Sequence, residues 1–177
     1  MDKGKKTTSN DWIEEFCKEG INYMEDLPKL AQTYRGKRVT LKSPEDVVVR
    51  ITELDGTIYM GRKHMYEAWE HLYLPEPRKM VLIGAIDDTY HFEEDIQLIV
   101  LVDSLGNVYF YESEVLHHVA CSVKDFFTKG ARYPPMRSYR YGEYCSRIED
   151  ATPEYNQAET ESFFLHDHEV LLPLPGN

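Results

Sequence analysis

The chain has 177 residues, of which 42% are hydrophobic and 29% are charged, a composition typical of a single soluble globular domain. Its net charge of −11 disfavours binding to phosphate backbones and to anionic membranes. Because the chain contains no apolar run of about 18 residues and begins with a polar segment, we expect neither a membrane-spanning helix nor a secretory signal.

The three cysteines, Cys17, Cys121 and Cys145, are widely spaced and odd in number. This usage suits reduced thiols better than a framework of disulfides. We therefore expect an intracellular, cytoplasmic protein.

The N-terminal segments predict a disordered start and a helix. Residues 1–9 are polar and are expected to be disordered. Apolar residues at helical spacing from Trp12 to Cys17 predict an amphipathic helix. Residues 21–27 could continue it, and Pro28 is expected to stop it or to open a new turn, because proline lacks the backbone N–H that a helix interior needs.

The next segments predict strands and one helix. Residues 38–41 and 47–54 have the β-branched composition of strands. An Asp-Gly pair at 55–56 separates the second of them from residues 57–60, and such a pair between β-rich runs predicts a hairpin. Apolar residues then recur every three or four positions, which predicts a helix over residues 62–73.

Two aliphatic runs, residues 80–86 and 96–102, are short and rich in β-branched side chains. They predict strands that are covered on both faces, in the middle of a sheet. Asp103 and Gly106 suit a turn, so residues 107–111 are expected to return as the next strand of a hairpin.

The last predicted elements are a strand over residues 115–121, at the edge of the sheet, and a helix from Ser122 to Gly130. Successive strands with helices before and after them predict an α+β fold with a mainly antiparallel central sheet and flanking helices. We assign this single domain to residues 10–145. Residues 146–177 are expected to form an acidic tail with an apolar end, which must pack on its own domain or on a partner.

The first candidate for function is a cluster of carboxylates. Residues 87–95, which we call the acidic segment, hold five carboxylates and His91. One interpretation is a recognition surface for a basic protein partner, since charge complementarity speeds association. Paired carboxylates with a histidine could also support metal-assisted hydrolysis if one of them were buried. The predicted partner-binding residues in this segment are Asp87, Asp88, Glu93, Glu94 and Asp95.

The second candidate covers residues 132–144, where three arginines alternate with four tyrosines. Tyrosine and arginine are enriched at the centres of protein interfaces, but the same pattern can stack on the bases of single-stranded nucleic acid. The net charge favours a protein interface over nucleic acid, and a packed surface loop without a role stays a third option. The predicted partner-binding residues here are Tyr133, Arg137, Tyr139, Arg140 and Tyr141.

Nothing in the sequence predicts a catalytic residue, a metal site or a cofactor. The phosphate-binding motifs GxxxxGK(S/T) and GxGxxG and the hydrolase motif GxSxG are absent. His166 with His168, or His117 and His118 with Cys121, could supply metal ligands, but their spacing does not complete a zinc site. We therefore expect a non-enzymatic protein.

The order of segments around the central hairpin resembles that of the SUKH superfamily. This superfamily takes in bacterial toxin-immunity proteins and a branch in large DNA viruses that is named for the unique-short region of cytomegalovirus. The matching features lie within residues 62–130 and are Gly84, the hydrophobic strand that closes on Asp103 and Gly106, Val108–Tyr109, Val119–Ala120, and the helix Ser122–Gly130.

The resemblance implies an α+β domain that binds proteins and has no activity of its own. Bacterial members neutralise toxins, often nucleases, and the viral branch is associated with interference in host defence and with the virion tegument. The family shares no catalytic residues, so none is carried over to this chain. We expect the chain to mask or inhibit a protein, such as a nuclease-type toxin or a host defence factor, and a viral protein would do so in the host cytoplasm or nucleus.

Overall fold

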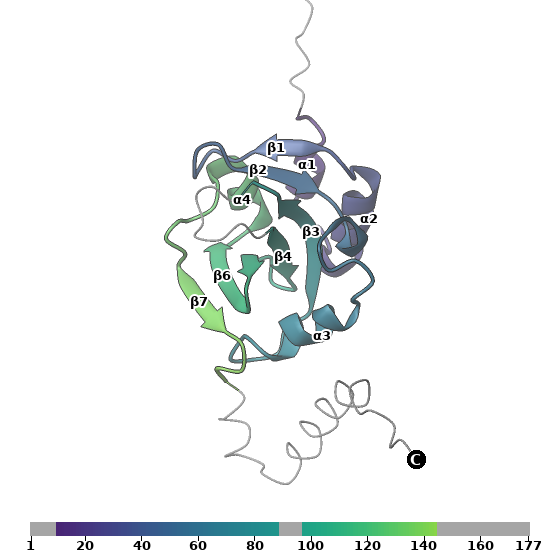
Figure 1. The fold of residues 1–177 in the computed structure, drawn as a ribbon. Helices are drawn as coiled ribbons and strands as arrows, with labels where there is room; N and C mark the ends of the chain where they lie inside the picture. Colours follow the sequence, from purple (N-terminus) through teal and green to yellow (C-terminus); the bar gives the residue numbers. More distant parts are fainter. Residues whose placement is uncertain (1–9, 89–96, 145–177) are drawn as a thin grey trace, which may run out of the picture. The chain divides into compact units, whose positions relative to one another are not determined.

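Residues 10–88 and 97–144 are described by a computed structural model of the chain (Figure 1). Within these ranges, seven strands form one antiparallel sheet in which each strand pairs with the next along the chain. The strands are β1 (Arg38–Thr40), β2 (Val48–Ile51), β3 (Met80–Ile86), β4 (Leu98–Asp103), β5 (Val108–Glu112), β6 (Val115–Ala120) and β7 (Arg137–Arg140). The helices are α1 (Ile13–Phe16), α2 (Tyr23–Thr33), α3 (His64–His71), α4 (Val123–Lys129) and the short 3-10 helix η1 (Leu54–Gly56). The predicted α+β fold is confirmed.

The centre of the sheet is formed by β3 and β4, in which every residue is buried. Successive side chains of a strand point to opposite faces of its sheet. Val100 and Val102 of β4 accordingly belong to one hydrophobic core, and Ile99 and Leu101 belong to the other. The prediction of strands covered on both faces is confirmed, because helices pack on each side of the sheet.

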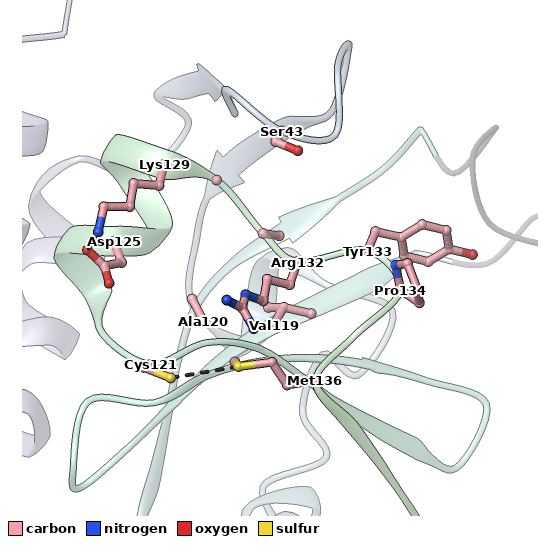
Figure 2. Close-up of a pocket in the computed structure, with 12 residues that line it drawn as sticks. Ser43, Val119, Ala120, Cys121, Asp125, Lys129, Arg132, Tyr133, Pro134 and Met136 are labelled. Atoms are coloured by element: carbon pink, nitrogen blue, oxygen red, sulfur yellow. Dashed lines mark hydrogen bonds and ion pairs between the residues drawn. The ribbon is translucent and has the colours of Figure 1, made fainter.

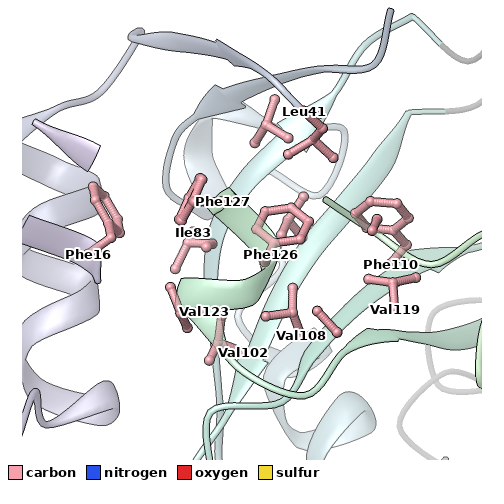
Figure 3. Packing of buried hydrophobic residues seen from close by; sticks show 14 of the residues in the cluster. Phe16, Leu41, Ile83, Val102, Val108, Phe110, Val119, Val123, Phe126 and Phe127 are labelled. Carbon is pink, nitrogen blue, oxygen red and sulfur yellow. The ribbon is translucent and has the colours of Figure 1, made fainter. Parts of the chain in front are cut away.

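The first core lies between the sheet and the helices α1, α2 and α4. The ring of Phe16 in α1 lies 5.6 Å from that of Phe127 in α4, and Phe126 lies 6.0 Å from Phe110 of β5. Figure 3 shows these rings spread across this core, with Ile83 of β3 between Phe16 and Phe126 and with Phe110 at the far side. Each fully buried side chain of this size contributes about 1.5–3 kcal/mol, so the contacts of these short helices with the sheet fix their positions.

The second core lies on the other face of the sheet, under α3. Trp69 of α3 is fully buried, and its ring meets those of Tyr66 and Tyr111 edge to face, at centroid distances of 5.4 and 5.5 Å. The buried hydroxyl groups of Tyr73 and Tyr111 share a hydrogen bond of 3.0 Å. This bond gives both polar groups a partner inside an otherwise apolar core.

Gly84 marks a point where two strands approach closely. The register of β3 against β4 shifts between Leu82 and Gly84. A Cβ atom on Gly84 would lie 2.9 Å from the carbonyl oxygen of Arg50 in β2. Gly84, which matches the family pattern, is therefore required because the backbones of β2 and β3 approach closely, and not because it takes part in a functional site.

The hairpin predicted at residues 55–56 is wrong. The helix η1 takes up this pair, and residues 57–60 form a bend and turns instead of a strand. The guanidinium of Arg50 donates to the carbonyl oxygen of Gly56 (2.9 Å), and the Asp55 carboxylate accepts the backbone N–H of Gly61 (3.3 Å). These contacts fold the loop back on itself and outweigh the local preference for a tight turn.

Two further predictions are wrong in detail. Pro28 lies inside α2 and does not end it. The helix begins after Asn22, whose side chain caps it by accepting the Met24 backbone N–H (3.2 Å). The complete burial of Leu27 and Ala31 offsets the hydrogen bond that this proline cannot make. The strand β6 is not at the edge of the sheet, because β7 pairs with it.

The sheet and its helices belong to one compact unit that ends at Tyr141. None of the helices within residues 10–88 and 97–144 combines the length and the apolar composition that crossing a bilayer requires. The predicted disorder of residues 1–9 and the predicted tail of residues 146–177 lie outside the described residues. The boundaries of the single domain, 10 and 145, stay predictions.

Candidate protein-binding surface

The register of the sheet brings the two predicted segments to the same end of the sheet. Ile86, the residue before the acidic segment, pairs with Leu98 of β4. Val115 pairs with Glu112 on one side and with Arg140 of β7 on the other. Because Ile99 pairs with Tyr111, Leu98 and Glu112 lie at the same level of the sheet. The acidic segment therefore starts at the end of the sheet where β7 finishes.

The first residue of the acidic segment is held by a network of side chains. Asp87 accepts two hydrogen bonds from the guanidinium of Arg50, at 2.8 and 3.0 Å, and one from the Gln97 amide at 2.6 Å. The hydrogen bond from Arg50 is the main cause that lowers the pKa of Asp87 from its usual range. This carboxylate is therefore a fixed anchor for the neighbouring loop.

That neighbouring loop, residues 57–61, presents two exposed apolar side chains, and we call it the apolar loop. Its Ile58 backbone N–H donates to the side-chain oxygen of Gln97 (2.9 Å), which ties the loop to Asp87. Ile58 and Met60 are 53% and 68% exposed, whereas Tyr59 between them turns inward. The ring of Tyr59 lies 5.9 Å from that of Trp69. The sequence prediction assigned this loop to a strand and missed it as a functional candidate.

The second predicted segment contains β7. The guanidinium carbon of Arg137 lies 5.0 Å from the centre of the Tyr139 ring, within the range of a cation–π contact. Tyr139 packs against the second core, and Tyr141 meets the ring of Tyr73 edge to face at 5.9 Å. Tyr139 and Tyr141 therefore hold β7 against the side of the second core, while Arg137 and Arg140 are exposed.

The predicted partner-binding residues do not form one patch. Asp87 lies beside the apolar loop, and Asp88 is exposed next to it. Tyr133 is separated from this region, because it precedes β7 at the strand's other end and lines a pocket near α4. The remaining acids of the acidic segment, Glu93, Glu94 and Asp95, lie outside the described residues.

The model of the US22 like family matches residues 13–138, which run from α1 into β7. The chain belongs to the US22-like family. This match confirms the viral branch of the SUKH superfamily that the order of segments predicted. No solved structure matches the chain.

The relatives of this US22-like chain include several viral proteins. It is 32% identical to the "Uncharacterized gene 87 protein" of Gallid herpesvirus 2 over 125 residues, 71% of this chain and 70% of the relative. It is 36% identical to "Uncharacterized protein 005R" of Frog virus 3 over 115 residues, 65% of this chain and 56% of the relative. A shorter match, 36% over 64 residues, joins it to "Uncharacterized protein FPV250" of Fowlpox virus and covers 36% of this chain and 45% of the relative.

Two histidines of this US22-like domain, His117 and His118, make contacts within the sheet. The Nδ1 atom of His117 lies 2.7 Å from the Ser138 hydroxyl, and His118 stacks on Tyr109 with its Nε2 atom 3.0 Å from the Ala120 carbonyl oxygen. Burial lowers the pKa of His118. Among the described residues, no group of three or more His, Cys, Asp and Glu side chains could hold a metal ion. His91, His166 and His168 lie outside those residues.

Replacing Asp87 with asparagine is expected to destabilise this US22-like domain slightly, in a pH-dependent way. Arg50 holds the pKa of Asp87 below its usual range, so the stabilisation is present above the ordinary aspartate pKa of about 3.9 and is lost as the pH falls through the lower folded value. Urea midpoints of wild type and Asp87→Asn should therefore differ near neutral pH and converge as the pH falls through the lowered pKa of Asp87.

Asp46→Asn is the control for this experiment. Asp46 is exposed and forms no ion pair within residues 10–88 and 97–144, and asparagine tolerates its positive φ of 65°. Its variant should follow the wild type at every pH. A difference for Asp87→Asn that stays constant down to low pH would contradict the role of the Arg50 pair.

Proposed function

We propose that this chain is a protein-binding domain without catalytic activity, which masks a basic, partly apolar surface of a host-cell protein. The observation that carries the proposal is the apolar loop beside the acidic segment. Ile58 and Met60 expose two large apolar side chains from a loop that hydrogen bonds fix in place. Exposed apolar groups with a charged border are typical of the centre and rim of a protein interface.

The fixed shape of the apolar loop supports this proposal. Arg50 binds both Asp87 and Gly56, and Gln97 binds both Asp87 and Ile58, so one network joins the loop to the sheet. Binding by a loop that is already ordered avoids most of the entropy cost of ordering it in the complex. The two apolar side chains would therefore contribute most of their burial energy to affinity.

The charge of the acidic segment indicates the kind of partner. Asp88 is exposed beside Asp87, and three more acids follow in the sequence. A concentration of negative charge next to an apolar contact attracts a positively charged surface and raises the association rate. We infer that the apolar loop fills a depression on the partner while the acids face its basic rim.

The viral relatives support a host protein as the target in place of a bacterial toxin. The proteins of Gallid herpesvirus 2, Frog virus 3 and Fowlpox virus come from viruses of vertebrates, which carry out their replication inside host cells. A domain of this kind would act in the host cytoplasm or nucleus. Arg140 at the end of β7 and the exposed Tyr141 that follows it, at the same end of the sheet, form a second contact in this proposal.

Two experiments test the proposal: capture of binding proteins from a cell extract, and measurement of the rate at which a captured protein associates with the chain. The full chain and the Ile58→Ser/Met60→Ser variant are immobilised, exposed to an extract of vertebrate cells, and compared by quantitative mass spectrometry. We expect the wild type to capture basic proteins that the variant does not capture. When such a protein is purified, its affinity for the variant should be about thirtyfold weaker than for the wild type, because removal of interface hot spots costs about 2 kcal/mol. Leu105→Ser is the matched control, because Leu105 is 66% exposed in the β4–β5 turn.

The association rate tests the role of charge separately. Salt and charge reversal of Glu93, Glu94 and Asp95 should slow association with the captured protein while changing dissociation little. An association rate that neither salt nor charge reversal changes would remove the acidic segment from the mechanism. Equal binding by the double variant and the wild type would contradict the proposed function itself.

A further inference from the structure

A pocket of about 520 Å³ lies beside α4. Ala120, in its wall, pairs with Val108, and Val108 pairs with Val102, which lies opposite Val81 near the start of β3. The acidic segment follows the other end of β3. Ser43, in another wall, follows β1 at the level where β3 ends, but none of residues 57–61, 87 and 88 lines the pocket. The pocket is therefore a separate site from the surface proposed above.

The walls of this pocket are held firmly. The backbone N–H groups of Ala131 and Arg132 donate to the carbonyl oxygens of Ser43 and Val119, each at 2.8 Å. Gly130 has a φ of +99°, and a Cβ atom there would lie 2.3 Å from the Ser43 carbonyl oxygen. Only glycine allows the chain to pass at this point, so the segment that carries Arg132 has a fixed path.

The pocket combines one available cation with apolar walls. Figure 2 shows the guanidinium of Arg132 among the residues that line the pocket, which also include the Cys121 and Met136 sulfur atoms, 3.7 Å apart. Lys129 is bound by Asp125 at 3.1 Å, so its charge is matched. In the part of the chain that the structure describes, no carboxylate lies within ion-pair distance of Arg132.

We propose that this pocket binds a carboxylate group of a peptide, from an acidic side chain or from a C-terminus. The Arg132 guanidinium offers two parallel N–H donors, which match the two oxygens of a carboxylate. The buried side chains of Val119, Ala120 and Ala131 give the carbon stem of such a group an apolar wall. A single unmatched positive charge in a protein of net charge −11 suits a carboxylate better than a phosphate dianion.

The test is a titration of the full-length, isotope-labelled protein followed by NMR. Three short alanine peptides are compared: one with a central glutamate and blocked ends, one with a free C-terminus alone, and one with a central glutamine and blocked ends. We expect one or both carboxylate peptides to shift the amide signals of Ala120, Cys121 and Ala131, and the peptide that acts identifies the source. The glutamine peptide should cause no shift.

Two variants complete the experiment. Arg132→Gln should weaken binding of the carboxylate peptide by about tenfold or more, because a charge-assisted pair is lost. Arg35→Gln, which removes an exposed arginine after α2, should leave it unchanged. The proposal is wrong if the carboxylate peptides cause no shift, if Arg132→Gln binds them as well as wild type, or if inorganic phosphate shifts the same amides more strongly. None of these results depends on the apolar loop, so a failure of this proposal would leave the proposed protein-binding function untouched.

Discussion

Replacing Asp103 with alanine is expected to destabilise the domain by about 3–5 kcal/mol, because it leaves the buried Tyr109 hydroxyl and several part-buried donors without an acceptor. The Asp103 side chain is 0% exposed. Its carboxylate accepts hydrogen bonds from the Arg78 guanidinium (3.0 Å), the Tyr109 hydroxyl (2.8 Å) and the Leu105 backbone N–H (2.9 Å). It also accepts two from Asn107, one from the backbone and one from the side-chain amide, both at 3.0 Å.

These contacts explain why Asp103 follows the central strand β4. The backbone and Asn107 bonds close the turn into β5, while Tyr109 and Arg78 join that turn to the second face of the sheet. A single carboxylate therefore fixes both the hairpin and the chain that enters β3. The aspartate that matches the family pattern is a structural residue, and its loss should affect the hairpin before it affects any binding surface.

Urea unfolding monitored by circular dichroism measures this effect. Ser104→Ala, an exposed neighbour in the same turn, is the matched control and should change the free energy of unfolding by less than about 0.5 kcal/mol. Asp103→Asn should fall between the two, because its amide oxygen still accepts while its NH₂ group faces other donors. A loss of less than about 1 kcal/mol for Asp103→Ala would show that water replaces the carboxylate.

The sheet could be predicted from the sequence because its central strands carry their own signal. The runs that became β3 and β4 are too short and too β-branched for buried helices, and Asp103 with Gly106 marks the turn between β4 and β5. These are local properties, so they need no knowledge of what packs above or below. Gly84 and the helix α4 also lie where the order of segments placed them.

The candidate surface could be predicted only in part, because its contacts join residues far apart in the chain. The acidic segment is visible as a cluster of charge, but the hydrogen bond from Ile58 to Gln97 spans 39 positions. The Asp-Gly pair predicted a hairpin from its immediate neighbours alone. The hydrogen bond that competes with this hairpin comes from Arg50 in β2 and is not visible in the local sequence. Large side chains at every second position, Arg137, Tyr139 and Tyr141, are typical of a strand. The prolines just before them favoured a loop instead, so the strand was not predicted.

Trp69 connects the second core to the apolar loop, and its replacement by alanine is expected to affect both. Trp69 is 0% exposed and contacts the rings of Tyr59, Tyr66 and Tyr111 at centroid distances of 5.9, 5.4 and 5.5 Å. Removing a buried aromatic of this size should cost about 3–5 kcal/mol, through lost transfer energy and the cavity left behind. Tyr59 would lose one of the two ring contacts that hold it inward, and would keep the other, with Tyr111 at 5.9 Å.

Trp69→Phe separates the packing of Trp69 from its hydrogen bonding. Within the described residues, the buried indole N–H of Trp69 has no hydrogen-bond partner, so phenylalanine removes an unsatisfied donor while it keeps a ring against Tyr66 and Tyr111. The loss should stay near 1 kcal/mol, because the relief of the donor offsets part of the smaller ring's cavity. A loss as large as that of Trp69→Ala would mean that the indole N–H is satisfied.

Hydrogen exchange of the amides of residues 57–61 measures the second effect. In Trp69→Ala these amides should exchange faster than expected from the global loss of stability, because Tyr59 keeps only its contact with Tyr111 to hold the loop against the core. In Trp69→Phe they should exchange at close to the wild-type rate. If the apolar loop keeps its protection when Trp69 is truncated, then the network of Arg50, Asp87 and Gln97 is sufficient to hold Ile58 and Met60 in place.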